Sequence, residues 1–182
     1  MQDYIDSCGC GYSTQGAIKN LFGHLDRFAM ELDIISKCCS DLLTSAPIPE
    51  TTKEIFTDEE VSRVWENENL EWADSVLFFL YTGFRISEMI KLKTEDIDFE
   101  IRTMTGGVKT AAGKQRLVPI HSKIFHIVQS RAEQSKSGYL FEYGGKKLSQ
   151  TQYRKFWAGI MDKLEMQHTP HECRHTFRSR LD

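Results

Sequence analysis

Two short stretches of this chain carry residues suited to binding a phosphate group. Residues 82–88 read Thr-Gly-Phe-Arg-Ile-Ser-Glu, and residues 169–175 read Thr-Pro-His-Glu-Cys-Arg-His. His171 and Arg174 are three positions apart, so on a helix they share one face. Guanidinium groups bind phosphate through paired, charge-assisted hydrogen bonds, and a histidine adds a further donor. Arg85, His171 and Arg174 therefore form a candidate phosphate-binding set.

The elements around these stretches predict rigid positions for the side chains. The apolar run at residues 76–81 is typical of a buried helix. Gly83 is expected to end that helix, because glycine adopts the left-handed conformation without steric cost. A new helix is predicted to begin near Arg85, which places its guanidinium at the corner of two helices. Pro170 is expected in the first turn of the helix that carries the second stretch.

The charges are unevenly distributed along the sequence. Residues 1–82 hold 5 Lys and Arg against 15 Asp and Glu, a net charge of −10. Residues 83–182 hold 18 against 11, a net charge of +7, and the two sum to −3 for the whole chain. The basic part carries both arginine stretches, which indicates a polyanionic partner. Ordinary scatter in composition is the competing explanation.

The composition is that of a folded protein that does not enter a membrane. Of the 182 residues, 40% are hydrophobic and 11% aromatic, enough to build a core. No apolar run approaches the roughly 20 residues that span a bilayer, and residues 1–3 begin no signal-peptide pattern. We expect a soluble, cytoplasmic chain with no membrane partner, in which the five cysteines are reduced.

Four of the cysteines raise the question of a zinc site. Cys8 and Cys10 are separated by one residue, and Cys38 and Cys39 are adjacent. Paired zinc ligands are usually separated by roughly two to four residues. Neither pair has this spacing, so we expect no metal site here.

Hydrophobic periodicity predicts an α+β fold that is mainly α-helical, with a small antiparallel three-stranded sheet. Helices are expected at residues 15–32, 34–43, 58–67, 71–82, 86–92, 122–133 and 150–164, and from residue 171 onward. Strands are expected at residues 99–104, 107–110 and 115–120, with the last two joined as a hairpin through residues 111–114.

Capping residues and prolines define the boundaries. Ser13 or Thr14 is available to cap the first helix, and Asp33 is expected to end it. Residues 57–60 and 149–152 read as capping boxes that open later helices.

The prolines at positions 47 and 49 mark a linker. We therefore divide the chain into a helical remnant at residues 1–46, a linker at residues 47–55 and a second domain at residues 56–182.

Three motifs in this order resemble the tyrosine recombinases, the phage-integrase family. They are TGFRISE at residues 82–88, a predicted hairpin with Lys-Thr and then Arg-x-Val-Pro-Ile at residues 116–120, and TPHECRH at residues 169–175. The resemblance runs from about residue 56 to residue 182 and is greatest to integrases of phages and bacterial conjugative elements. Cys173 stands where the family usually has leucine, and it is also a small hydrophobe. Residues 1–46 resemble the end of the family's core-binding domain.

The resemblance implies site-specific DNA recombination and integration. In this family, strands are cleaved and rejoined through a 3′-phosphotyrosyl intermediate, with no metal or nucleotide cofactor. The implied partner is double-stranded DNA, on which a full-length protein would assemble as a homo-oligomer, a synaptic tetramer. The chemistry agrees with the residues, because preorganised donors stabilise the charge that gathers on a phosphate in transfer.

The resemblance also implies a role for each residue. Arg85 and Arg174 would clamp the scissile phosphate, and His171 would add a hydrogen bond or transfer a proton. Lys109, on the hairpin, would protonate the departing 5′ oxygen as general acid. Lys114 lies on the same hairpin and is the alternative; Lys109 is preferred because it precedes a threonine, as in the family pattern.

Two further residues are implied to support these. Glu88, one helical turn after Arg85, would orient the site, and His175 would support it without touching the substrate. Structural roles compete with these assignments: Arg85 would form a corner salt bridge with Glu88, and His171 would cap its helix.

Two elements of the family pattern are not found in this chain: the second histidine or tryptophan and the nucleophilic tyrosine. The six tyrosines precede the second stretch; they are Tyr4, Tyr12, Tyr81, Tyr139, Tyr143 and Tyr153. Tyr153 is expected on a core-facing helix stripe. We therefore expect an incomplete catalytic domain that does not cleave DNA. The competing hypotheses are a non-catalytic DNA-binding remnant of an integrase and a helical protein-interaction module.

Overall fold

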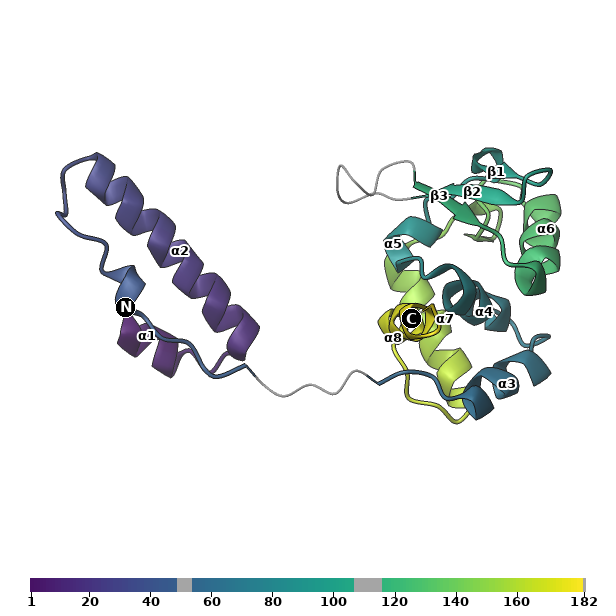
Figure 1. Cartoon of the computed structure of the whole chain (residues 1–182), viewed down its shortest axis with the longest axis horizontal. Coiled ribbons are helices and arrows are strands. Elements are labelled where there is room, and N and C mark those ends of the chain that lie inside the picture. Colours follow the sequence, from purple (N-terminus) through teal and green to yellow (C-terminus); the bar gives the residue numbers. More distant parts are fainter. Residues whose placement is uncertain (49–53, 107–115, 182) are drawn as a thin grey trace. The chain divides into compact units, whose positions relative to one another are not determined.

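The computed structural model describes residues 1–48, 54–106 and 116–181. The chain forms two compact units, Met1–Thr52 and Lys53–Asp182 (Figure 1). The first unit holds two α-helices, and the second holds the remaining α-helices and both β-sheets.

The first unit consists of α1 (Gln2–Ser7), α2 (Tyr12–Glu31) and the short 3-10 helix η1 (Ser40–Leu42). Asp26, on α2, is buried and accepts a hydrogen bond of 2.7 Å from the backbone N–H of Ser40. This bond lowers the pKa of Asp26, and it holds η1 against the long helix.

Two sequence predictions for this unit are wrong in detail. The helix begins at Tyr12 with Gly11 as its N-cap, so Ser13 and Thr14 lie inside the first turn and do not cap it. Asp33 ends the helical region as predicted, with φ of 54°. The helix expected at residues 34–43 is reduced to η1 alone, because the backbone of this segment bonds to the Asp26 carboxylate instead of continuing a helix.

The second unit contains six α-helices among its described residues. They are α3 (Asp58–Glu66), α4 (Ala73–Thr82), α5 (Ile86–Met89), α6 (Phe125–Gln134), α7 (Gln150–Lys163) and α8 (Pro170–Ser179). Two 3-10 helices, η2 (Thr94–Asp96) and η4 (Ser122–Ile124), precede β1 and α6. The predicted capping boxes at Thr57 and Ser149 are confirmed and open α3 and α7.

A three-stranded antiparallel sheet lies at the end of the unit opposite α3 (Figure 1). Its strands are β1 (Ile97–Asp98), β2 (Thr103–Gly106) and β3 (Arg116–Pro119), in that order. β2 and β3 pair with Gly106 opposite Arg116 and Met104 opposite Val118. The predicted fold class, mainly helical with a small antiparallel three-stranded sheet, is confirmed.

The predicted strand positions need correction. Residues 99–104 do not form one strand, because the Asp98 carboxylate accepts the backbone N–H groups of Glu100 and Ile101 at 3.0 Å each and folds a turn there. Arg102 completes this turn with φ of 53°. The predicted strand at 107–110 and the hairpin at 111–114 lie outside the described residues.

Two further elements differ from the prediction. The helix expected at residues 86–92 ends at Met89. A second hairpin, β4 (Glu142–Tyr143) with β5 (Lys146–Lys147), was not predicted, because each of its strands has only two residues.

α4 forms the centre of the hydrophobic core, and eight of its ten residues are buried. Tyr153, on α7, is fully buried with its hydroxyl 2.8 Å from Ser75 Oγ on α4, which confirms its core-facing position. Burial raises the pKa of Tyr153 well above its ordinary value. Within the described residues, no helix combines the length and the apolar character needed to cross a membrane.

Candidate phosphate-binding site

Gly83 and Arg85 occupy the corner between α4 and α5. Gly83 ends α4 in the left-handed conformation, with φ of 61°, and its N–H bonds the Phe79 carbonyl at 2.9 Å, as predicted. Arg85 has an extended backbone and is the N-cap residue of α5. A residue at such a corner has little backbone freedom, so its side chain starts from a fixed point.

Glu88 holds the Arg85 side chain in place. Its Oε2 accepts the backbone N–H of Arg85 at 2.9 Å, and its Oε1 accepts Arg85 Nη1 at 3.1 Å. The Glu88 side chain is only 4% exposed, whereas that of Arg85 is 43% exposed. The buried carboxylate therefore anchors one part of the guanidinium while the rest faces solvent.

The N-terminus of α8 is fixed by its own capping box and by a contact with the start of the unit. The Thr169 hydroxyl and N–H donate to the Glu172 carboxylate at 2.9 and 3.1 Å, and Pro170 occupies the first turn as predicted. Thr176, one turn further on, accepts the backbone N–H of Phe56 at 2.9 Å. These bonds set the rotation of α8 and hence the direction of Arg174.

Arg174 reaches across to the first motif. Its Nη1 donates a short hydrogen bond to the carbonyl oxygen of Gly83. Burial lowers the pKa of Arg174, as do the positive charges of Arg85 and Arg116, and Glu88 acts in the opposite direction. Arg85 and Arg116 are thus paired with one carboxylate and Arg174 lies near enough to feel all three charges, which leaves an excess of positive charge that an anion would neutralise.

His171 and Arg85 both line a cavity of about 530 Å³. The polar residues that line it are Arg85, Ser87, Gln150, Arg154, Thr169 and His171. The exposed His171 ring packs edge-on against the half-buried ring of His175, with centroids 4.6 Å apart. The structure therefore brings together Arg85, Glu88, His171 and Arg174, with His175 next to His171.

Lys109 and Lys114 lie outside the described residues. The assignment of a general acid to either lysine stays a prediction.

Sequence reasoning missed the place of Arg116 in this cluster. Its Nη2 lies 3.5 Å from Glu88 Oε2, and its guanidinium carbon lies 5.3 Å from the centre of the Phe84 ring. The signal was present in the alternation of β3: Val118 is buried, so Arg116, two positions earlier, faces the same side.

His168 was also missed, and it joins α3 to α8. Its Nε2 lies 3.1 Å from Glu60 and its Nδ1 2.8 Å from Glu172, while its ring stacks on Phe56 at 3.9 Å. A ligand atom from Glu54 lies within 4.8 Å of those of His168 and Glu172. Both ring nitrogens of His168 already face carboxylates, so we interpret this group as a structural ion-pair network.

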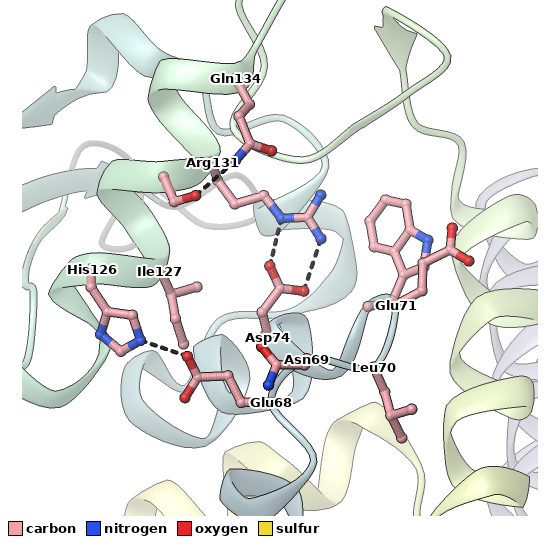
Figure 2. A pocket seen from close by; sticks show the side chains of 11 residues that line it. Glu68, Asn69, Leu70, Glu71, Asp74, His126, Ile127, Arg131 and Gln134 are labelled. Carbon is pink, nitrogen blue, oxygen red and sulfur yellow. Dashed lines mark hydrogen bonds and ion pairs between the residues drawn. The ribbon is translucent and has the colours of Figure 1, made fainter.

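A second cavity, of about 300 Å³, lies between α6 and the connection from α3 to α4 (Figure 2). Arg131 and His126 in its lining each face a carboxylate. Arg131 donates to both oxygens of Asp74 at 2.5 and 2.8 Å, and His126 lies 2.8 Å from Glu68 (Figure 2). Unlike the three arginines around Glu88, these pairs leave no excess of positive charge.

Comparison with known proteins places the chain in a family. The model of the "Phage integrase family" matches residues 55–182. A tyrosine recombinase XerA from Pyrococcus furiosus is 30% identical over 153 residues, which cover 78% of this chain and 52% of the relative. A tyrosine recombinase XerD from Mycobacterium tuberculosis is 32% identical over 124 residues, covering 59% of this chain and 38% of the relative. The chain thus spans about half the length of the first relative and a smaller share of the second.

Solved structures share the fold. The Tn1549 transposon integrase, in complex with circular intermediate DNA, matches with a TM-score of 0.77 at 23% identity, over 97% of this chain and 68% of that one. A lambda integrase tetramer bound to a Holliday junction matches with a TM-score of 0.76 at 15% identity, over 97% of this chain and 56% of that one. Because the family model covers most of the chain and the fold agrees, this chain belongs to the phage integrase family of tyrosine recombinases.

Proposed function

We propose that this chain supplies the phosphate clamp of a site-specific DNA recombinase. The observation that carries the proposal is the hydrogen bond from Arg174 to the Gly83 carbonyl. This bond joins the second motif to the first, two residues before Arg85, whose side chain is 43% exposed. Guanidinium groups fixed in this way suit a phosphodiester, which they bind through paired donors. The relatives named as tyrosine recombinases support the same proposal.

In this proposal each residue has one role. Arg85 and Arg174 bind the non-bridging oxygens of the scissile phosphate, and His171 donates a further hydrogen bond or transfers a proton. Lys109, or Lys114 in its place, protonates the departing 5′ oxygen. Glu88 orients Arg85, and no cofactor takes part.

The partner we propose is double-stranded DNA, with a homo-oligomer as the active assembly of the whole protein. The DNA-bound Tn1549 and lambda integrases support the first point, and the lambda tetramer supports the second. The proposed domain division, a core-binding remnant at residues 1–46, a linker at 47–55 and a catalytic domain from residue 56, follows from the same family.

We further propose that this chain forms no covalent bond with DNA, because three of the tyrosines in the second unit are engaged elsewhere. Tyr153 is buried and bonded to Ser75. Tyr81 packs against Trp65, and Tyr143 against Phe156. None of these contacts directs a phenol toward the clamp, where in-line attack on the phosphorus would require it.

DNA binding tests the clamp. We expect the chain to bind a random-sequence duplex in a mobility-shift assay, with affinity that falls steeply between roughly 50 and 200 mM salt. Arg85→Gln should weaken binding uniformly across sequences and reduce the slope of log affinity against log salt by about one. The matched control is Lys163→Gln, which removes one charge from the exposed last turn of α7. Equal losses in both variants, or binding that is insensitive to salt, would contradict the proposal.

A denaturing gel tests the tyrosine proposal in the same samples. The chain is incubated with a nicked duplex under conditions where the mobility shift shows binding. We expect no protein–DNA band that survives denaturation. Such a band, lost on substitution of one of the six tyrosines by phenylalanine, would identify that tyrosine as the nucleophile and overturn the proposal.

A further inference from the structure

Arg116 sits at the base of the sheet, against the residue that precedes Arg85. It is the first residue of β3 and pairs with Gly106 of β2. A Cβ on Gly106 would lie 2.5 Å from Phe84 Cζ, so the absence of a side chain lets the Phe84 ring approach the strand. The Arg116 guanidinium packs over the same ring at 5.3 Å. Phe84 is thus held between the backbone of one strand and the side chain of its neighbour.

Arg116 also shares the carboxylate that anchors Arg85. Glu88 Oε2 accepts the Arg85 backbone N–H at 2.9 Å and lies 3.5 Å from Arg116 Nη2, while Oε1 accepts Arg85 Nη1 at 3.1 Å. The Glu88 side chain is 4% exposed, so each of these contacts acts in a poorly hydrated environment. A buried carboxylate between two guanidiniums has less freedom to rotate than one with a single partner.

We propose that Arg116 is a positioning residue of the phosphate clamp, and that it acts on Arg85 through Glu88. The proposal rests on the proposed function of the site. Arg116 fixes the carboxylate from the sheet side, and the carboxylate fixes the Arg85 guanidinium from the α5 side. The orientation of Arg85 therefore depends on the β2–β3 pairing as well as on the corner between α4 and α5.

A direct contact between Arg116 and the phosphate is the competing explanation. Nε and Nη2 of Arg116 are buried and make no hydrogen bond to any of the described residues. Positioning is favoured because Nη2 already forms an ion pair with Glu88. The two explanations differ in whether the effect of Arg116 passes through Glu88.

The experiment is a double-mutant cycle read on the Arg85 side chain by NMR. In the full chain without DNA, we measure rotation of the Arg85 guanidinium, and then the affinity for inorganic phosphate from the shift of its Nε–H signal. Arg116→Gln should speed the rotation and weaken phosphate binding by about tenfold, the size of effect usual for coupled neighbours. Arg116→Lys keeps the charge near Glu88 and should restore part of both signals. In a Glu88→Gln background, Arg116→Gln should change neither.

The controls separate this inference from the proposed function. Arg102→Gln is the matched control, because Arg102 lies in the turn before β2 and packs over Phe125 at 4.8 Å, with no ion pair to Glu88 among the described residues; we expect it to leave the Arg85 signals unchanged. An equal loss of phosphate affinity from Arg116→Gln in the native and Glu88→Gln backgrounds would show direct contact and overturn the inference. The rotation measurement needs no DNA, so it tests the positioning role even if the chain fails to bind a duplex.

Discussion

A single glycine combines three structural tasks at the candidate site. Gly83 ends α4 in the left-handed conformation, its carbonyl oxygen accepts the Arg174 guanidinium, and its missing side chain makes room for Phe177. A Cβ at this position would lie 2.5 Å from Phe177 Cδ1. The position therefore links the backbone geometry next to Arg85 to the packing of α8.

We predict that Gly83→Ala destabilises the chain by about 2–4 kcal/mol, because a left-handed alanine costs about 1 kcal/mol or more and the clash with Phe177 adds overpacking. Urea unfolding measures this change. The control is Gly159→Ala in α7, where a Cβ would meet nothing within 4 Å. There the substitution should stabilise the helix by roughly 0.5–1 kcal/mol, and destabilisation of similar size in both variants would contradict the prediction.

Among the elements, α3 and α8 depend on one another through His168. Burial alone would raise the pKa of Glu60, but hydrogen bonds from the Thr57 backbone and from His168 outweigh it and hold the pKa below its ordinary 4.5. Burial would likewise raise the pKa of Glu172, but hydrogen bonds from His168 and Thr169 outweigh it and lower that pKa. Carboxylates with lowered pKa contribute stability only while they are ionised.

We predict that Glu60→Gln lowers the free energy of unfolding at neutral pH but not in acid. The paired carboxylate stabilises the fold above the ordinary glutamate pKa of 4.5, and this contribution disappears as the pH falls through the lower, folded pKa. Glutamine keeps the oxygen that the capping box requires, so the change removes mainly the charge. Denaturant unfolding from pH 7 to pH 3 measures the difference.

Glu59→Gln is the control, because Glu59 is an exposed neighbour in the same first turn of α3. A loss at neutral pH that is equal in both variants would show that general charge balance, and not the His168 contact, is responsible.

Local signals in the sequence predicted the elements that depend on local bonds. The capping boxes at Thr57 and Ser149 gave the starts of α3 and α7, and Gly83 gave the end of α4. The prediction of a strand at residues 99–104 was wrong, because the Asp98 carboxylate bonds to the backbone and forms a turn that competes with strand pairing. The alternation of β3 indicates which side Arg116 faces, but its contact with Glu88 joins residues far apart in the chain, so the local pattern could not identify the partner.

At the scale of the whole molecule, the two units differ in how much apolar surface they bury. The main core cluster consists entirely of residues of the second unit. In the first unit, several large apolar side chains are mostly exposed: Tyr4, Leu21, Leu25, Phe28, Leu32, Ile34, Leu42 and Ile48. Exposed apolar groups of this kind favour association.

We predict that the fragment 53–182 keeps its fold and associates less than the full chain. Its core is complete within the fragment, whereas the first unit leaves its own apolar side chains uncovered. Circular dichroism measures the fold and light scattering the association. If the fragment self-associates as much as the full chain, the surface responsible lies in the second unit and the prediction is wrong.

The bond between Arg174 and Gly83 also has a temporal consequence. Its partners are 91 residues apart, so it closes one of the longest loops in the unit. During synthesis the corner that carries Arg85 leaves the ribosome well before α8 does. A nascent chain with α4 and α5 already folded still has only one of the two arginines of the proposed clamp, so we expect binding to a backbone phosphate to appear only after α8 has packed against α4.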